Sequence, residues 1–336
     1  MHKQFLLALL ALLLLVGFGT FWLLQKVNAE VPDAPESPVE RCMNLSGALE
    51  APIEGSWGYT IREEDLHRMK AAGFDTVRLP VRWTLLFSED GWYPEQQQLA
   101  RVDEVIALAR SAGLKIILNV HHYNALFEDP DTHEPRLEDL WAYLSLHYKN
   151  APEDLIFELI NEPHANLTVK RTDALNRKLL AIVREHHPDR WVLYGTAEWG
   201  GLSGMLRSDP LYDPKALIGY HYYAPYDFTH QGAFFANPPP PVGKTWGTDS
   251  DQKNVRRDFR KASKFRDRRG MALILGEFGV YENVPLDQRA NWTEFVRMEA
   301  ESAGFGWCHW GFATTFKSYD LGQERWIPEI LSALIP

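Results

Sequence analysis

Short apolar segments alternate with longer amphipathic segments along most of the chain. The apolar segments are rich in β-branched and aromatic residues and are followed by polar residues, which is typical of buried strands. Eight of them succeed one another, at residues 42–45, 76–79, 115–120, 155–159, 191–194, 217–220, 272–275 and 306–309.

The intervening segments carry apolar residues at helical spacing. Residues 62–72 place Leu66 and Met69 on one face and stop at Gly73, which is a typical helix C-cap. The same reasoning predicts further helices at residues 99–112, 168–187, 251–269, 286–303 and 328–334.

This alternation of strands and helices predicts a parallel sheet of the α/β class. No G-x-G-x-x-G fingerprint follows any of the strands, which favours a closed (β/α)8 TIM barrel over an open doubly wound sheet. A barrel of about 250 residues plus insertions fits residues 41–336 as one catalytic domain. Because barrel active sites are built from the loops after the strands, the long loop at 231–248 is expected to border the site.

The N-terminal segment lies outside this pattern. A short basic start precedes an apolar run from Phe5 to Leu24, which is long enough to span a bilayer. Small residues at Val27 and Ala29 also fit a cleavage site, so residues 1–29 are either a signal peptide or an uncleaved membrane anchor. Both interpretations predict an exported protein, whether secreted, periplasmic or tethered. Residues 30–40 are rich in proline and acids and read as a linker.

The charge balance limits the choice of partners. The net charge is −10 and the pI is about 5.7, which argues against a nucleic-acid or anionic-membrane partner. Membrane contact is therefore expected only through the N-terminal segment. The basic stretch within residues 253–269 is interpreted as the solvated outer face of a barrel helix. The default oligomeric state is a monomer.

The chain has only two cysteines, Cys42 and Cys308. In a barrel they lie on the first and last strands, which are neighbours, so a disulfide is conceivable in an oxidising compartment. The demanding geometry of a bridge favours two buried free thiols instead.

Two glutamates stand directly after strand-like segments. Glu162 follows in Leu-Ile-Asn-Glu-Pro-His and Glu277 in Leu-Gly-Glu-Phe-Gly. Two carboxylates delivered from two strand ends of one barrel are what a retaining glycosidase requires, with carboxyl groups about 5–5.5 Å apart. Other polar or aromatic residues at strand ends are expected to converge on the same face: Arg78, His121, His122, Asn161, His221, Tyr223 and Trp310.

These motifs, in this order, resemble glycoside hydrolase family 5, the family of many bacterial endo-β-1,4-glucanases. The resemblance runs from about residue 41 to residue 334 and is carried by the segments GFDTVRLPVRW, NVHHY, FELINEPH, GTAEWGG, HYYAPYDFTHQGA and ILGEFGVY and by the Trp310 strand. It implies a retaining endoglycosidase that cuts internal β-1,4 bonds of cellulose or a related β-glucan by double displacement, without a cofactor or a metal. β-Mannan or glucomannan is the alternative substrate within the family.

The resemblance also implies a role for each site residue. Glu162 matches the general acid/base and Glu277 the nucleophile. Asn161 matches the residue that binds the sugar 2-hydroxyl, and Arg78 and Tyr223 match the groups that orient the nucleophile. His121 and His221 match histidines beside the same sugar, and Trp310 matches the aromatic ring beneath it. His122 is their neighbour and is expected to contact substrate.

The chain departs from the family at one loop. Where close members carry a second asparagine that reaches a sugar subsite, this chain has Gly47. That change leaves the catalytic pair intact but leaves subsite affinity and substrate preference open. Glu50 follows in the same loop, where contact with sugar and a buried structural role are equally compatible with the sequence.

Two further classes of function are compatible with parts of the sequence. His121, His122, His164 and His221 could be imagined as a metal cluster, but no H-E-x-x-H motif is present and the Asn-Glu-Pro motif explains the same face without metal. A non-catalytic carbohydrate-binding barrel is the other alternative, since a fold does not guarantee activity.

Overall fold

The structure is a computed structural model that describes residues 34–336 of the 336-residue chain. The predicted signal peptide or anchor at residues 1–29 and the first part of the predicted linker lie outside the described residues. Among the residues from 34 onward, no helix is both long and apolar enough to span a bilayer.

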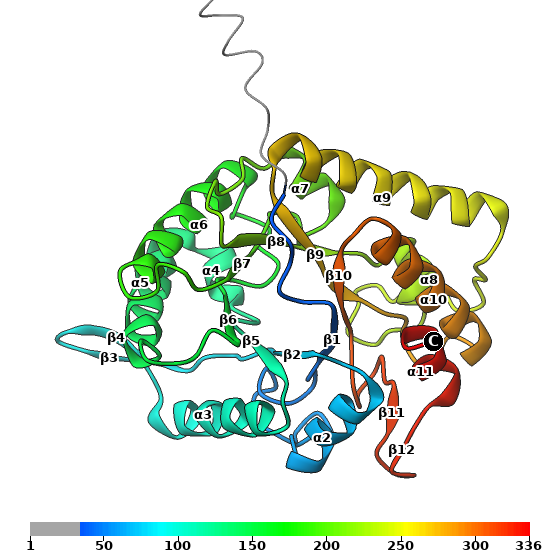
Figure 1. The fold of residues 1–336 in the computed structure, drawn as a ribbon, viewed down its shortest axis with the longest axis horizontal. Helices are drawn as coiled ribbons and strands as arrows, with labels where there is room; N and C mark the ends of the chain where they lie inside the picture. The colour runs from blue at the N-terminus through cyan, green and yellow to red at the C-terminus, as the bar shows by residue number, and fades with distance from the viewer. Residues whose placement is uncertain (1–33) are drawn as a thin grey trace, which may run out of the picture.

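Eight parallel strands close into a barrel, in the spatial order β1-β10-β9-β8-β7-β6-β5-β2 (Figure 1). The strands are β1 (Arg41–Asn44), β2 (Thr76–Leu79), β5 (Lys115–Asn119), β6 (Leu155–Glu158), β7 (Val192–Gly195), β8 (Ala216–His221), β9 (Ala272–Phe278) and β10 (Gly306–His309). Each overlaps one of the eight predicted strands, and the predicted (β/α)8 barrel is confirmed. The pairing of β1 with β10 joins the first and last strands of the barrel and closes it. Residues 34–336 therefore contain the whole barrel and its core.

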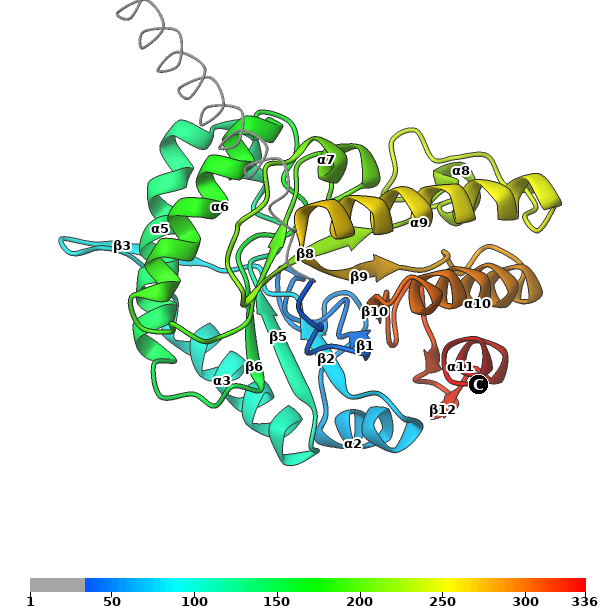
Figure 2. The same ribbon diagram turned by 45° about the horizontal axis from the view of Figure 1, so that its top comes forward.

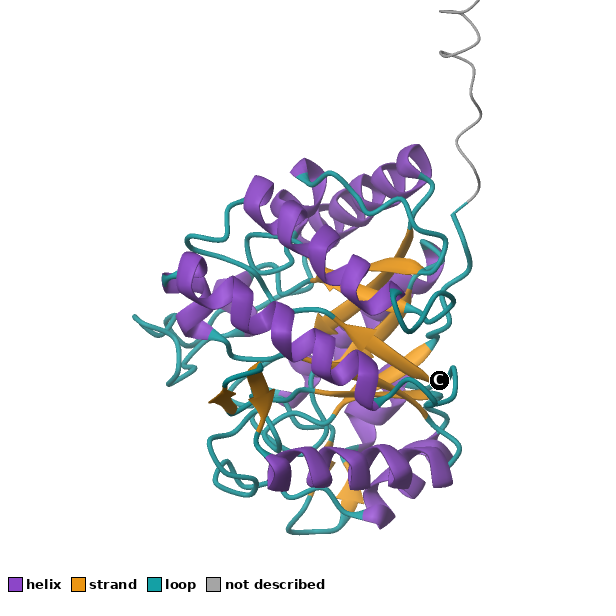
Figure 3. Cartoon of the chain, turned by 90° about the vertical axis from the view of Figure 1, so that its left-hand side faces the viewer, coloured by secondary structure: helices purple, strands orange, loops and turns teal. Residues whose placement is uncertain are grey.

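Helices surround the barrel on its outside (Figures 1 and 3). Those predicted from the sequence are α2 (Glu63–Ala72), α3 (Gln96–Ser111), α6 (Val169–Arg184), α9 (Asp249–Arg269), α10 (Leu286–Ser302) and α11 (Pro328–Leu334). The structure adds α4 (Asn124–Glu128), α5 (Pro130–His147), α7 (Leu202–Arg207) and α8 (Tyr226–Thr229). Helix α5 was missed because Pro130 and Pro135 interrupt its pattern, although Pro130 sits at the helix start, where a missing N–H costs little.

Two short antiparallel pairs decorate the barrel. The hairpin of β3 (Leu85–Ser88) and β4 (Gly91–Pro94) projects from the loop after β2 (Figure 2). The second pair is β11 (Tyr319–Asp320) with β12 (Arg325–Trp326), which follows the loop after β10. Neither was predicted from the sequence.

The barrel interior has two layers: a lower, apolar layer toward the amino ends of the strands and an upper, polar layer toward their carboxyl ends. The lower layer packs Cys42, Ile117 and Ile156 with inward residues of the other strands. Because side chains two positions apart on a strand point to the same side, the residues two positions further along also face inward, and these are Asn44, Asn119 and Glu158. Every inward polar group of this upper layer is buried, so each requires a partner inside the barrel.

Cys42 and Cys308 form a disulfide in the lower layer, so the expectation of two free thiols is wrong. The register of the β1–β10 pair places Cys42 directly opposite Cys308, and both residues belong to the apolar cluster inside the barrel. The bridge links the first and last strands of the barrel across 266 residues of sequence. Sequence alone shows neither the register nor the direction of the two side chains.

Replacing both cysteines, as Cys42→Ala with Cys308→Ala, is expected to lower the free energy of unfolding by about 4 kcal/mol. The reason is that a bridge closing so long a loop restricts the unfolded chain. Thermal denaturation of the variant and the parent measures the effect. Reductant without denaturant should leave the native parent unchanged, because both sulfur atoms are fully buried. An unchanged Tm in the double variant contradicts a stabilising role for the bridge.

Candidate active site

Arg78 on β2 is the centre of the polar layer at the carboxyl end of the barrel. Its guanidinium is fully buried and donates to two oxygens of Glu158, at 2.6 and 2.7 Å. It also donates to Asn44 Oδ1 at 2.8 Å, to Glu277 Oε1 at 2.7 Å and to Asn161 Oδ1 at 2.7 Å. One cation thus holds four side chains, which come from β1, from β9, and from β6 and the loop after it.

The charges around Arg78 balance the cost of burying it. Burial lowers the pKa of Arg78, but the negative charges of Glu158 and Glu277 and the hydrogen bonds to them raise it by more, so the guanidinium stays protonated. Glu158 is itself buried and makes the paired, two-bond contact that a carboxylate makes best with arginine. Sequence reasoning missed Glu158, although a glutamate inside the apolar run Leu-Ile-Phe-Glu-Leu-Ile signals a buried partner for an arginine elsewhere.

Glu277 is the second-to-last residue of β9, and both of its carboxylate oxygens are engaged. Oε1 accepts from Arg78, and Oε2 accepts the hydroxyl of Tyr223 at 3.1 Å. Burial, followed by the charge of Glu277, raises the pKa of Tyr223 well above its usual value, so this hydroxyl remains a donor. Two donors fix the carboxylate in place and stabilise its negative charge, which is what a nucleophile at this position requires.

Glu162 stands in the loop after β6, with its backbone in the left-handed region at a φ of 45°. Its Oε1 contacts His221 Nδ1 at 2.8 Å, and its side chain remains 25% exposed, far more than that of Glu277 at 6%. A carboxylate oxygen of Glu162 lies within 4.8 Å of one of Glu277. This distance between the nearest oxygens is compatible with the carboxyl separation of a retaining pair, which is about 5–5.5 Å.

His221 at the end of β8 bridges the two carboxylates. Its Nδ1 lies 2.8 Å from Glu162 Oε1 and 3.6 Å from Glu277 Oε2. Burial lowers the pKa of His221, but the charge of Glu277 and the hydrogen bond to Glu162 outweigh it, so the pKa lies above its usual value. The imidazole therefore holds a proton more readily than a free histidine, at a position between the two carboxylates.

His121, His122 and Trp310 form an aromatic wall next to this centre. The His121 ring is parallel to Trp310 at 5.5 Å, and His122 meets His121 edge-on at 4.5 Å. Burial lowers the pKa of His121, and it lowers that of His122 to about 4, so both rings are neutral near pH 7. Neutral rings can form hydrogen bonds with sugar hydroxyls without forming ion pairs with the two glutamates.

Glu50 is almost completely buried and orders the loop after β1. Its two oxygens accept the backbone N–H groups of Gly47 and of Ala48, the latter at 3.1 Å. Burial is the main cause that raises the pKa of Glu50 to about 7. The structure thus shows the loop-ordering role, and contact of Glu50 with sugar stays a prediction.

Gly47 in the same loop has a φ of 82°, a conformation that asparagine tolerates better than most residues. The obstacle to a larger residue is Thr314, because a Cβ on Gly47 would lie 2.2 Å from its Cγ2. Thr314 also hydrogen-bonds the carbonyl of Ser46 at 3.3 Å. The departure of this chain from the family at position 47 is therefore coupled to the loop after β10.

Aromatic residues at the rim were missed by sequence reasoning. Trp57 is 45% exposed and meets the edge of His122, and Trp199 is 56% exposed and stacks on His164 at 4.7 Å. Nothing in the sequence distinguishes an exposed tryptophan from a core one. The predicted loop at 231–248 does lie beside the site, where Ala233 and Ala236 pack in a cluster that includes Tyr223 and Trp310.

The metal alternative finds little support in the geometry. In the described part of the chain, Glu162, His221 and Glu277 are the three ligand-type side chains close enough to share an ion. His121, His122 and His164 do not join them. Arg78 already neutralises Glu277, and His221 Nδ1 is directed at Glu162, so the same atoms are engaged without an ion.

Gly47→Asn is expected to destabilise the fold by about 1–3 kcal/mol because it overpacks Thr314. Adding Thr314→Ala should restore most of that loss. Gly58→Asn is the matched control, since Gly58 has a φ of 88° and open space where a Cβ would lie. Urea denaturation of these variants, of Thr314→Ala alone and of the parent measures the coupling. Equal stability of Gly47→Asn and Gly58→Asn contradicts the proposed clash.

Comparison with known proteins agrees with this geometry. The family model described as Cellulase (glycosyl hydrolase family 5) matches residues 33–314. Endoglucanase H of Acetivibrio thermocellus is 33% identical over 298 residues, which cover 87% of this chain and 32% of the relative. This chain thus spans about a third of the length of that relative and 39% of the Cellulase/esterase CelE of the same organism.

Solved structures share the fold over nearly their whole length. Cel5A of Thermotoga maritima in complex with cellobiose is 36% identical with a TM-score of 0.86, covering 88% of this chain and 97% of that one. The cellulose synthase subunit Z of Clostridioides difficile is 28% identical with a TM-score of 0.85, covering 89% and 100%. The chain therefore belongs to glycosyl hydrolase family 5, the cellulase family.

Proposed function

We propose that the protein is a retaining endo-β-1,4-glucanase. The observation that carries this proposal is the Glu162–Glu277 pair, held within 4.8 Å and supported by Arg78, Tyr223 and His221. The pair has the separation that double displacement requires, and its two members have different surroundings. Glu277 is buried among donors, whereas Glu162 is partly open to the cleft side.

In the first step, a Glu277 oxygen attacks the anomeric carbon of the sugar while Glu162 gives its proton to the leaving glycosidic oxygen. The bond to the leaving sugar breaks and a covalent glycosyl ester forms on Glu277. In the second step, Glu162 takes a proton from water, the water oxygen attacks the anomeric carbon, and Glu277 leaves as a carboxylate. Two inversions give net retention.

The supporting residues act on these charges. Arg78 and Tyr223 hold the Glu277 carboxylate in position for attack. They stabilise its negative charge again when hydrolysis of the ester regenerates it. His221 remains bonded to Glu162, which keeps that carboxyl aimed at the leaving oxygen. The Trp310 ring and the neighbouring histidines present an apolar face and neutral donors to the sugar.

We propose a β-glucan as the preferred polymer, with mannan as the alternative. The relatives support both, since structures of Thermotoga maritima Cel5A are described in complex with cellobiose and with mannotriose. Glucose and mannose differ in the orientation of one hydroxyl, so one altered hydrogen bond can change the preference.

The assay that tests this function is reducing-sugar release from carboxymethyl cellulose, mixed-linkage β-glucan, glucomannan and β-mannan. The parent is expected to act on the glucans, and Glu277→Gln to lose activity on all four by at least about 10⁴-fold while remaining folded. Glu162→Gln should lose activity on polymers but retain part of it on aryl glycosides, whose leaving groups need little protonation. Equal loss on both kinds of substrate contradicts the acid role. Activity mainly on mannan keeps the mechanism and overturns the substrate.

We further propose that the protein is exported and held at a membrane by its N-terminal segment. The apolar run from Phe5 to Leu24 supports this, and so does the Cys42–Cys308 bridge, since stable disulfides form in oxidising compartments. Fractionation of cells that make the full chain tests the proposal. The protein is expected in the membrane fraction, with both cysteines protected from alkylation. Recovery from the cytosol with free thiols contradicts it.

A further inference from the structure

The outer face of α9 carries a continuous row of basic side chains. Its exposed basic residues are Lys253, Arg256, Arg257, Arg260, Lys261, Lys264, Arg268 and Arg269. The opposite face is buried through Val255, Phe259, Ala262 and Phe265. The basic residues run from Lys253 to Arg269, so the row extends over about 24 Å of the helix. Figure 1 shows α9 at the periphery of the barrel.

Four of these residues form what we term the basic row: Lys253, Arg260, Lys264 and Arg268. Spacings of seven, four and four residues bring them into one line along the helix. Within residues 34–336, no ion pair involves any of the four, whereas Arg256 pairs with Glu299.

Two acids within the basic stretch of α9 are already engaged with basic neighbours. Asp258 lies between Arg257 and Lys261 and pairs with both. Asp267, which is exposed in the last turn, pairs with Arg266. The row is therefore a local positive surface on a chain whose net charge is −10. Since salt screens charges beyond about 8 Å, it is this local surface and not the net charge that a partner in contact with α9 experiences.

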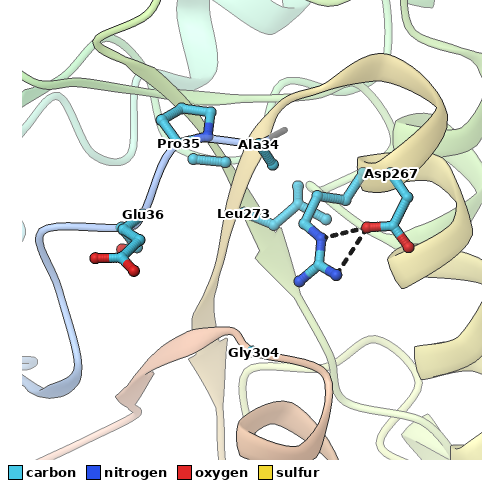
Figure 4. Close-up of a pocket in the computed structure, with 9 residues that line it drawn as sticks. Ala34, Pro35, Glu36, Asp267, Leu273 and Gly304 are labelled. Carbon is cyan, nitrogen blue, oxygen red and sulfur yellow. Dashed lines mark hydrogen bonds and ion pairs between the residues drawn. The ribbon is translucent and has the colours of Figure 1, made fainter. Parts of the chain in front are cut away.

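The chain enters the barrel beside the end of this helix. Figure 4 shows Ala34, Pro35 and Glu36 around a cavity of about 300 Å³ whose other side is formed by Asp267, Leu273 and Gly304. Nine residues, 25–33, separate Ala34 from the apolar run that ends at Leu24. A stretch of that length spans at most about 30 Å. An N-terminal anchor therefore holds the last turn of α9 within reach of the bilayer surface.

We propose that the basic row binds anionic phospholipid headgroups and lays α9 along the surface of the membrane. The lipid surface is the partner that satisfies both observations, since it offers many negative charges in a plane and lies where the chain enters. The proposal rests on the proposed tether for its geometry, but it is independent of hydrolysis. It goes beyond anchoring, because it specifies which side of the barrel faces the lipid.

This orientation leaves the active site open. Helix α9 leads into β9, so it runs antiparallel to the strands, with its first turn toward the catalytic end of the barrel. With α9 lying on the membrane, the barrel axis is parallel to the bilayer. The site opens sideways, and a polysaccharide chain running along the membrane surface can reach it.

Vesicle flotation of residues 34–336 tests the proposal without the apolar segment. The parent is expected to float with vesicles containing 30% phosphatidylglycerol in phosphatidylcholine, and not with pure phosphatidylcholine. Replacing all four residues of the basic row by glutamine should weaken binding by about 100-fold or more. Raising sodium chloride from 0.1 to 0.5 M should weaken parent binding similarly.

The matched control replaces four exposed basic residues elsewhere by glutamine, namely Lys70, Lys149, Lys170 and Arg325, none of which forms an ion pair within residues 34–336. It changes the net charge equally and should bind within about threefold of the parent. Both variants should hydrolyse soluble glucan like the parent. Equal weakening in the two variants, absence of binding to the anionic vesicles, or binding only to an acidic polysaccharide such as polygalacturonate overturns the proposal. Flotation of the full chain with pure phosphatidylcholine vesicles tests the tether separately.

Discussion

The site depends on a single buried cation. Arg78 has no contact with solvent, and its guanidinium is shared by Glu158, Glu277, Asn44 and Asn161. A charge in such a place is stable only when every donor has an acceptor and the local charge is balanced. Glu158 supplies one compensating charge for structure alone, which leaves Glu277 free to gain and lose its own during the reaction. A barrel without Glu158 would bury a cation whose only carboxylate is the one that becomes an ester.

The layering of the barrel interior explains how a small fold provides this environment. The strand period of two places apolar side chains and the Cys42–Cys308 bridge in the lower layer and polar groups in the layer above. The lower layer resists collapse, so the polar groups above are held by packing as well as by hydrogen bonds. Loops then add what the strands cannot supply. One of them, ordered by Glu50, brings Gly47 against Thr314 of the loop after β10.

Much of this could be predicted from the sequence, and the exceptions have physical reasons. Strands, barrel and the two glutamates follow from periodicity and from the rule that catalytic groups stand at strand ends. Glu158 was missed because its partner is 80 residues away and pairing across a barrel leaves no local pattern. The disulfide was judged wrongly because it depends on register. Glu50 could not be assigned because burial of a loop carboxyl is decided by neighbours distant in sequence. Helix α5 was hidden by its prolines, and the rim tryptophans by the fact that exposure has no signature in composition.

The net charge averages over a surface that is locally uneven. The sequence already predicts that the basic stretch lies on the outer face of a helix, and the fold adds that the four residues of the basic row form no ion pair within residues 34–336. The same reasoning applies to the active site, where function depends on which charges are neighbours and not on how many there are.

The most direct test of the account is the rate at which a 2-deoxy-2-fluoro cellobioside with an activated leaving group labels the protein, followed by peptide mass spectrometry. The fluorine slows hydrolysis of the glycosyl ester, so the nucleophile is captured. The account predicts an adduct on Glu277, formed at least about 100-fold more slowly in Arg78→Lys, because lysine cannot hold Glu158 and Glu277 together. An adduct on another residue, or equal labelling rates in the two proteins, would contradict it.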